Sequence, residues 1–220
     1  MLKKLFILSL ALAAVGCAGV KTVPLSEESI PMIEGRAISG SFSSEKPGFA
    51  AMTAGKGAFG ALGAVAMISA GNKLVAENNV EDPAGYIYDS LATELAKEYS
   101  LRLLEDTRIE TSGAKLDDLT AQVSDARLLL DVRTTNWNFV YFPTTWNKYK
   151  VGYSAVLRLV DTSTKEVLAE SMCSKFSHED SETAPTYDEL VGNQAARLKQ
   201  ELHAAADYCI GEFKANTLRL

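Results

Sequence analysis

Apolar and polar side chains alternate between residues 148 and 159, and this is the clearest hydrophobic pattern in the chain. The apolar positions are Tyr149, Val151, Tyr153, Ala155, Leu157 and Leu159. A period of two predicts a β-strand with one buried face and one face largely exposed to water. After the turn DTSTKE, the segment VLAESMCSKF (167–176) predicts a returning partner strand. Before the alternation, ARLLLDVRTTNWNFVYF (126–142) is rich in aromatic and β-branched residues, which predicts a long strand.

Elsewhere apolar residues recur at spacings of three and four, a period that predicts amphipathic helices. The first helix is expected at 83–99, because Asp82 is a favoured cap and Pro83 is tolerated in the first turn. A short strand at 101–106 and a short helix at 115–123 follow. The last helix, 187–214, carries an apolar stripe made of Val191, Ala195, Leu198, Leu202, Ala205, Cys209 and Phe213.

Together these elements predict an α/β (α+β) fold, a single domain over residues 81–220 with a mixed, largely antiparallel sheet packed by helices. Residues 17–48 are rich in Ser, Gly, Glu and Pro, which predicts a flexible tether ahead of the domain. Within that range MIEGRAISGSF (32–42) also has the pattern of a strand.

A segment rich in Gly and Ala, 49–80, separates the tether from the domain, and its residues 57–71 carry no charge. Gly57, Gly60 and Gly63 recur every three residues, so a helix here would have a stripe without side chains. Fifteen helical residues reach only about 22 Å, short of the roughly 30 Å core of a bilayer. We expect a helix packed on the domain or a glycine-rich hinge. Membrane insertion and self-association through the glycines remain alternatives.

The amino terminus has the three-part pattern of a secretory signal peptide, residues 1–16. Lys3 and Lys4 precede an apolar run of eleven residues, too short to span a membrane, and Ala14 and Gly16 are small. Cys17 follows directly, and this arrangement resembles a bacterial lipobox. The resemblance implies cleavage after Gly16 and acylation of Cys17. Ala18 in the next position implies sorting to the outer membrane, with the protein facing the periplasm.

Charge and cysteine content restrict the partners and the compartment. Removal of the leader takes two of the 22 basic residues, which leaves 20 against 28 acidic ones. A net charge of about −8 argues against nucleic acid and against electrostatic binding to anionic lipids. With Cys17 acylated, Cys173 and Cys209 remain as a pair. A strand carries one and the core-facing stripe of the last helix carries the other, so we expect a disulfide; two buried thiols are the alternative.

From residue 83 onward the order of elements resembles the α/β domain shared by the curli-secretion lipoprotein and the amino-terminal domain of TolB. The segments that carry the likeness are LATELAKEYSLRLLED, LTAQVSDARLLLDVRTT and YSAVLRLVDTSTKEVLAE. In the last of these, Lys165 replaces the glycine of a D-x-x-T-G-E turn. The resemblance implies envelope assembly or partner docking rather than catalysis.

Catalytic motifs are missing from the sequence: it contains no G-x-S-x-G, H-E-x-x-H, C-x-x-C or phosphate-loop pattern. His178 lies in the acidic stretch SHEDSE, which lacks the ligand spacing of a calcium loop and reads as a solvated loop. His203 reads as an exposed helix residue. We therefore expect no enzyme activity, no cofactor and no metal site.

Aromatic residues are concentrated at 137–153, and Trp137, Phe142 and Trp146 are the candidate contacts for a protein partner. Phe142 and Trp146 flank a turn and are expected to be exposed; the alternative is that all these rings pack beneath helices. The sequence thus predicts an outer-membrane lipoprotein that serves as a non-catalytic binding or accessory factor of an envelope assembly or transport machine. An oligomeric pore built on the glycine-rich segment and a hydrolase with an unrecognised site are the alternatives.

Overall fold

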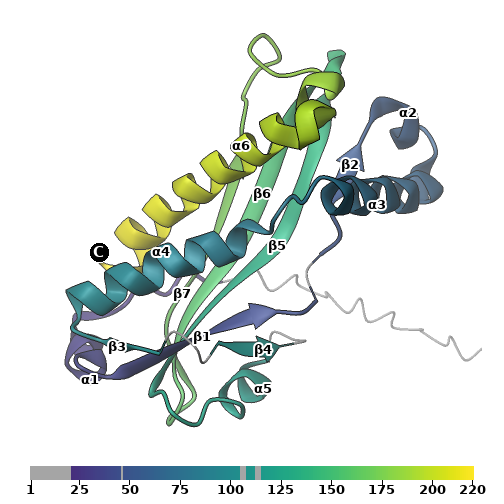
Figure 1. Cartoon of the computed structure of the whole chain (residues 1–220). Coiled ribbons are helices and arrows are strands. Elements are labelled where there is room, and N and C mark those ends of the chain that lie inside the picture. The colour runs from purple at the N-terminus through teal and green to yellow at the C-terminus, as the bar shows by residue number, and fades with distance from the viewer. Residues whose placement is uncertain (1–20, 46, 105–107, 112–114) are drawn as a thin grey trace, which may run out of the picture.

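Three long antiparallel strands form the centre of the structure, as the alternating pattern predicts. They are β5 (Leu128–Phe142), β6 (Thr145–Asp161) and β7 (Glu166–Phe176). Trp137 lies opposite Tyr153 across the first pair, and Ala155 lies opposite Cys173 across the second. The structure is a computed structural model and describes residues 21–45, 47–104, 108–111 and 115–220. The strands of its sheet follow the order β3-β1-β5-β6-β7, with β2 paired to β5 and β4 to β1 (Figure 1).

The four remaining strands pair in parallel, so the sheet is mixed, as predicted. The strand β1 (Ala37–Ser43) lies between β5 and β3 (Arg102–Leu103) and also pairs with β4 (Ile109–Thr111). Beyond the end of β1, β2 (Ala50–Met52) pairs with residues 138–140 of β5. The fold is thus a single α+β domain that begins well before residue 81.

The predicted tether, 17–48, is wrong over most of its described length. Val23 bridges to Glu170 of β7, Leu25 and Ile33 are fully buried, and β1 occupies the interior of the sheet. Two short helical segments, η1 (Glu27–Ser29) and α1 (Ile30–Ile33), connect these parts.

The polar composition of β1 hides its place in the sheet, because its serines and glycine are used by distant partners. Ser41 donates to a carboxylate oxygen of Asp131 at 2.6 Å, and both residues are fully buried. Gly40 lies under the ring of Tyr88, and a Cβ added at Gly40 would be only 2.3 Å from ring atoms of that tyrosine. Both contacts join residues far apart in sequence, so local composition does not reveal them.

Two long helices, α4 (Pro83–Glu98) and α6 (Tyr187–Phe213), lie side by side over one face of the sheet (Figure 1). Asp82 caps α4 by accepting from the N–H of Ala84, and Thr186 and Glu189 form a capping box at the start of α6. The short α5 (Leu116–Thr120) buries Leu119 in a second, smaller cluster with Leu129 and Val160. The predicted helices at 83–99 and 115–123 are confirmed.

The last predicted helix is present but interrupted. Gly192 has an extended backbone, and Asn193, Gln194 and Ala195 have φ values of 50° to 55°. The chain resumes a regular helix afterwards and ends in a short π-helical segment, η2 (Lys214–Leu218). Ala195 lies at this interruption and is fully buried, so the apolar stripe still faces the core where the helix is broken.

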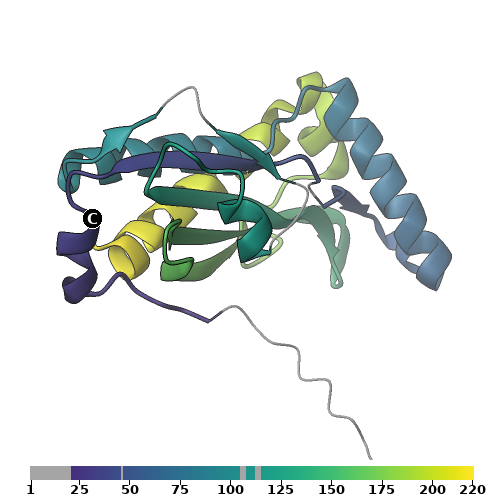
Figure 2. The same cartoon turned by 90° about the horizontal axis from the view of Figure 1, so that it is seen from below.

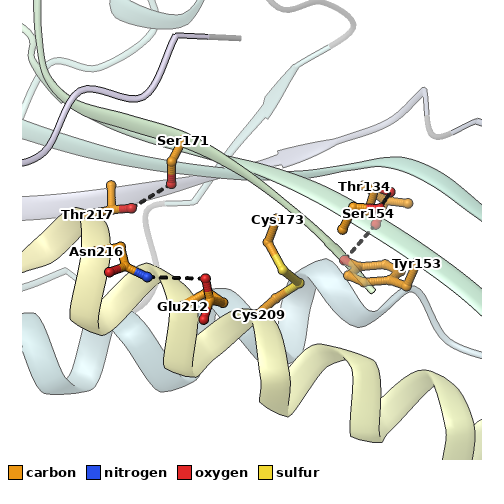
Figure 3. Close-up of a disulfide and its surroundings, with 10 residues drawn as sticks. Thr134, Tyr153, Ser154, Ser171, Cys173, Cys209, Glu212, Asn216 and Thr217 are labelled. Atoms are coloured by element: carbon orange, nitrogen blue, oxygen red, sulfur yellow. Dashed lines mark hydrogen bonds between the residues drawn. A yellow bond between two sulfur atoms is a disulfide. The ribbon is translucent and has the colours of Figure 1, made fainter. Parts of the chain in front are cut away.

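Cys173 of β7 and Cys209 of α6 form a disulfide, as predicted from their places on a strand and a core-facing helix stripe (Figure 3). Their Cα atoms are 5.5 Å apart, and both residues are buried. Nearby, the hydroxyls of Ser171 and Thr217 are 2.5 Å apart, a second link between β7 and the carboxyl-terminal segment. The bond covalently joins the sheet to the helix that covers it.

Candidate functional site

Trp137 is a core residue and not a contact for a partner. Its side chain is 1% exposed, its indole N–H donates to the carbonyl of Pro47 at 2.6 Å, and its ring meets that of Phe49 edge-on at 5.2 Å. The indole thereby fastens the segment between β1 and β2 to the sheet. We correct its assignment as a partner-binding residue, since burial leaves it no surface to offer.

The turn between β5 and β6 exposes one aromatic ring rather than two. Trp146 is 68% exposed, and its indole N–H donates to the carbonyl of Pro143 at 2.8 Å, which holds the ring at the tip. Phe142 is only 7% exposed, so its expected exposure is wrong. The ammonium group of Lys150 lies 5.6 Å from the Phe142 ring and 4.5 Å from the Phe176 ring, between the two. We call Pro143–Trp146 the hairpin tip.

Most of the other clustered aromatics pack in the core, as the alternative reading held. Phe139 meets Phe49, Tyr149 and Tyr187 edge-on, at centroid distances of 5.8, 5.5 and 5.9 Å. These rings come from a loop, two strands and the first turn of α6. These contacts join those elements, and Trp146 is the one aromatic residue of 137–153 that is largely exposed.

A second exposed apolar surface lies on the helical arm that follows β2. The arm consists of α2 (Ala54–Gly57) and α3 (Gly60–Glu77), and Figures 1 and 2 show α3 projecting away from the sheet. Its base is fixed at Gly71, where an added Cβ would lie 1.9 Å from the carbonyl oxygen of Phe49. Asn72 also accepts from the Phe49 N–H at 2.8 Å. Ile68 lies against Gly48, where an added Cβ would be 2.6 Å from its Cγ2 atom.

The arm exposes its large apolar side chains. Leu62 is 81% exposed, and the others are Phe59, Val65 and Ile68. The expectation that this segment packs on the domain is therefore wrong beyond its base. The close approach of α3 to the chain at Phe49, which Gly71 permits, is near the base of the helix.

The three glycines that suggested a helix-association stripe do not share one helix. Gly57 ends α2, and Gly60 has a φ of +55° at the start of α3. Gly63 is buried, and a Cβ there would lie 2.0 Å from the carbonyl oxygen of Lys56. Gly60 thus permits the turn and Gly63 the close approach of α2 to α3, so the predicted stripe is not present as an open surface.

The hairpin tip and the arm lie at the same end of the molecule. The strand β2, which leads into the arm, pairs with Asn138–Val140 near the end of β5. A Cβ at Gly57 would lie 3.3 Å from the hydroxyl oxygen of Tyr141, and Tyr141 is two residues before the start of the hairpin tip at Pro143. In Figure 1 the β5–β6 hairpin is at the top of the view, and α2 and α3 lie below it to the right.

His203 lies in an open groove of about 530 Å³ between the start of α4 and α6. It is 3.1 Å from a carboxylate oxygen of Asp207 and stacks on Tyr86 at 4.4 Å. Tyr86 donates to the same carboxylate at 2.8 Å, and this bond raises the pKa of the tyrosine. No Ser, Thr or Cys side chain is among the residues that line the groove, and the one hydroxyl beside the imidazole, that of Tyr86, donates to Asp207.

The loop that contains His178 is largely exposed, as predicted, but the His178 side chain itself turns inward. Its Nε2 atom is 3.1 Å from a carboxylate oxygen of Glu201, and Arg197 donates to the same oxygen at 2.7 Å. Glu201 is buried, so the pair fixes the loop before α6 to the body of that helix. In the parts of the chain that the structure describes, no group of three or more His, Cys, Asp or Glu side chains is placed to hold a metal ion.

The predicted acylation site, Cys17, lies outside the described residues. Over the part that is described, no helix combines the length and apolarity needed to cross a membrane.

No protein-family model matches the chain, and no curated protein matches it. Among solved structures, it is similar to the hypothetical protein CT253 from Chlamydia trachomatis, with 8% identity over 82% of this chain and 95% of that chain and a TM-score of 0.42. The PelC dodecamer from Paraburkholderia phytofirmans gives 10% identity, coverages of 85% and 94%, and a TM-score of 0.30. Lipoprotein GNA1162 from Neisseria meningitidis is 13% identical over 80% of this chain and 99% of that chain, with a TM-score of 0.30. Similarity at this level establishes neither a shared family nor a shared function.

Proposed function

We propose that this protein is a lipid-anchored protein of the bacterial outer membrane that faces the periplasm and binds a protein of an envelope assembly or transport machine. The observation that carries the binding proposal is the ring of Trp146, which is 68% exposed at the hairpin tip. Aromatic residues are enriched at protein–protein interfaces, and Trp is a frequent anchor there. The function is binding, without catalysis, a cofactor or a metal.

The proposed location in the periplasm is supported by the predicted signal peptide and by the disulfide. Disulfides persist in oxidising compartments such as the periplasm, and the Cys173–Cys209 bond is buried in the core. Only five residues separate Cys17 from Val23, which is bridged to β7. Such a connection spans at most about 20 Å. An acylated Cys17 would therefore hold the domain close to the bilayer, without the long tether expected from composition.

The anchor is tested by the intact mass of the protein extracted from membranes. We expect the mass of residues 17–220 plus a diacylglycerol and one further acyl chain, and loss of membrane retention in Cys17→Ser. A mass without lipid, or one that still contains the leader, would contradict the anchor.

Binding at the hairpin tip is tested by crosslinking in intact cells, followed by purification and mass spectrometry. Trp146→Ser removes an exposed ring that makes one hydrogen bond within its own turn, so we expect the melting temperature to stay nearly unchanged while a discrete adduct disappears. Met172→Ser is the matched control, because Met172 is 54% exposed on β7. An adduct that survives in Trp146→Ser, or that is lost equally in both variants, would remove the tip from the binding surface.

A further inference from the structure

We propose that the arm inserts into a lipid bilayer, with residues 58–69 of its far part entering the acyl-chain region. This occupant is favoured over a second protein by the distribution of exposed residues around α3, by the position of the nearest charges, and by the side of the molecule from which the arm projects.

The exposed positions of the far arm cover more of the helix than a single docked partner needs. They are Ala58, Phe59, Gly60, Ala61, Leu62, Ala64, Val65, Ala66, Ile68 and Ser69. At about 100° per residue, those from 61 to 69 span roughly 200° of the circumference of α3. A helix that docks on one protein surface needs an apolar stripe of about 100°, with polar residues opposite. Only the sector with Gly63 and Gly71 faces inward. The remainder is apolar or small, as immersion in lipid requires.

Charge is confined to the ends of this segment. No ionisable residue lies between Lys56 and Lys73, and Lys73 pairs with Glu77 at 3.6 Å toward the base. Lys56 lies beside Gly63 on the arm, and its long flexible side chain would extend along the arm to bring the ammonium group to the head groups. The ten residues of α3 from Gly60 to Ser69 reach about 15 Å, about half of the roughly 30 Å hydrocarbon core. The arm therefore enters one leaflet and does not cross the membrane.

A second copy of the chain is the less suitable occupant. Close helix–helix association in lipid uses small residues at the interface. Gly63 is already occupied by the Lys56 carbonyl and Gly71 by the Phe49 carbonyl, so neither is open to another helix.

The direction of the arm agrees with the proposed anchor. In Figure 2 the blue α3 runs downward from the body, toward the same lower side of the view as the first described residues, drawn in purple. The acylated residue would be within about 20 Å of Val23. This step rests on the function proposed above, but insertion itself requires no acyl chain. Because the mature chain carries 28 acidic against 20 basic residues, the attraction is apolar and not electrostatic.

The test uses residues 17–220 with Cys17→Ser, so that no acyl chain contributes, and flotation with phosphatidylcholine vesicles. We expect the protein to float with the vesicles. Leu62→Glu with Val65→Glu places two charges in the inserted part and should lower the vesicle-bound partition coefficient at least tenfold. Ala76→Glu with Ala204→Glu adds the same charge at two exposed helix positions off that segment and should leave partitioning unchanged. Unchanged melting temperatures would show that both variants fold.

Failure to float without the acyl chain, or equal partitioning of both double variants, overturns the proposal. A drop from oligomer to monomer in Leu62→Glu with Val65→Glu, measured without vesicles, would assign the surface to a second copy and overturn it as well. Neither result bears on the anchor, because the intact-mass measurement decides acylation separately.

Discussion

At the scale of single residues, the turn between β6 and β7 depends on a buried aspartate. Asp161 is 1% exposed and receives hydrogen bonds from Arg127 at 2.7 Å and from the Ser163 hydroxyl at 2.8 Å. Burial alone would raise its pKa, but these bonds and the backbone N–H groups of Ser163 and Thr164 outweigh burial and hold the pKa at about 2. The aspartate of the D-x-x-T-K-E turn is thus a charged group within the fold.

The lowered pKa of Asp161 makes stability depend on pH in the acid range. A depressed folded-state pKa contributes stability above the unfolded value, near 3.9, which is lost as the pH falls toward 2. We expect this residue to account for about 2 kcal/mol of the loss between pH 5 and pH 2. Urea unfolding across this range should show a flatter pH dependence for Asp161→Asn than for the wild type. Parallel curves would contradict the assignment.

Lys165 occupies a backbone conformation that favours glycine. Its φ is 60°, in the left-handed region that glycine adopts most readily. A side chain in the left-handed region costs roughly 1–2 kcal/mol. Its ammonium group is 2.8 Å from Asp117, but both groups are exposed, so the pair adds little. Lys165→Gly should therefore raise the free energy of unfolding by about 0.5–1 kcal/mol.

Lys165→Ala is the control for that prediction, since it removes the ion pair and keeps the unfavourable φ. It should leave stability unchanged or slightly lower in the same urea titration. If alanine stabilised the protein as much as glycine, backbone conformation would not be the cause.

At the scale of elements, the covalent link between β7 and α6 combines with their packing. The disulfide spans a sequence separation of 36 residues. Closing such a loop stabilises the folded state by about 4 kcal/mol in the chain-entropy model. Reduction should lower the melting temperature of the wild type accordingly. The variant with Cys173→Ala and Cys209→Ala should melt at the lower temperature with or without reductant. An insensitive wild type would mean that packing alone holds α6 on the sheet.

At the scale of the whole molecule, the amino-terminal segment closes the fold instead of leading up to it. Leu25 is fully buried, its N–H donates to the Thr217 carbonyl at 2.8 Å, and Val23 pairs with β7. We expect Leu25→Ala to cost about 2–5 kcal/mol, as for other buried leucines. The exposed Thr22→Ala is the control and should change stability by less than about 0.5 kcal/mol. If both variants were equally stable in chemical denaturation, the segment around Leu25 would be a flexible tether and not part of the fold.

Local sequence was sufficient for the elements whose burial follows a simple period. The two-residue alternation identified β6 and its partners, and the three-and-four spacing identified α4 and α6 with Cys209 on the core side. These patterns are readable because one face of each element meets the core along its whole length. The disulfide followed from the same reasoning, since Cys173 and Cys209 belong to elements that pack together.

Tertiary structure alone decided the place of β1 and β2, the burial of Trp137 and Phe142, and the exposure of the arm. Parallel pairing brings β1 beside β5 across about ninety residues of sequence, and its polar side chains find partners such as Asp131 only there. The glycines of 57–71 predicted close packing, yet whether a helix has anything to pack against depends on distant elements. The composition and periodicity of a segment indicate which of its side chains favour burial. Whether those side chains are buried depends on contacts with segments far apart in the chain.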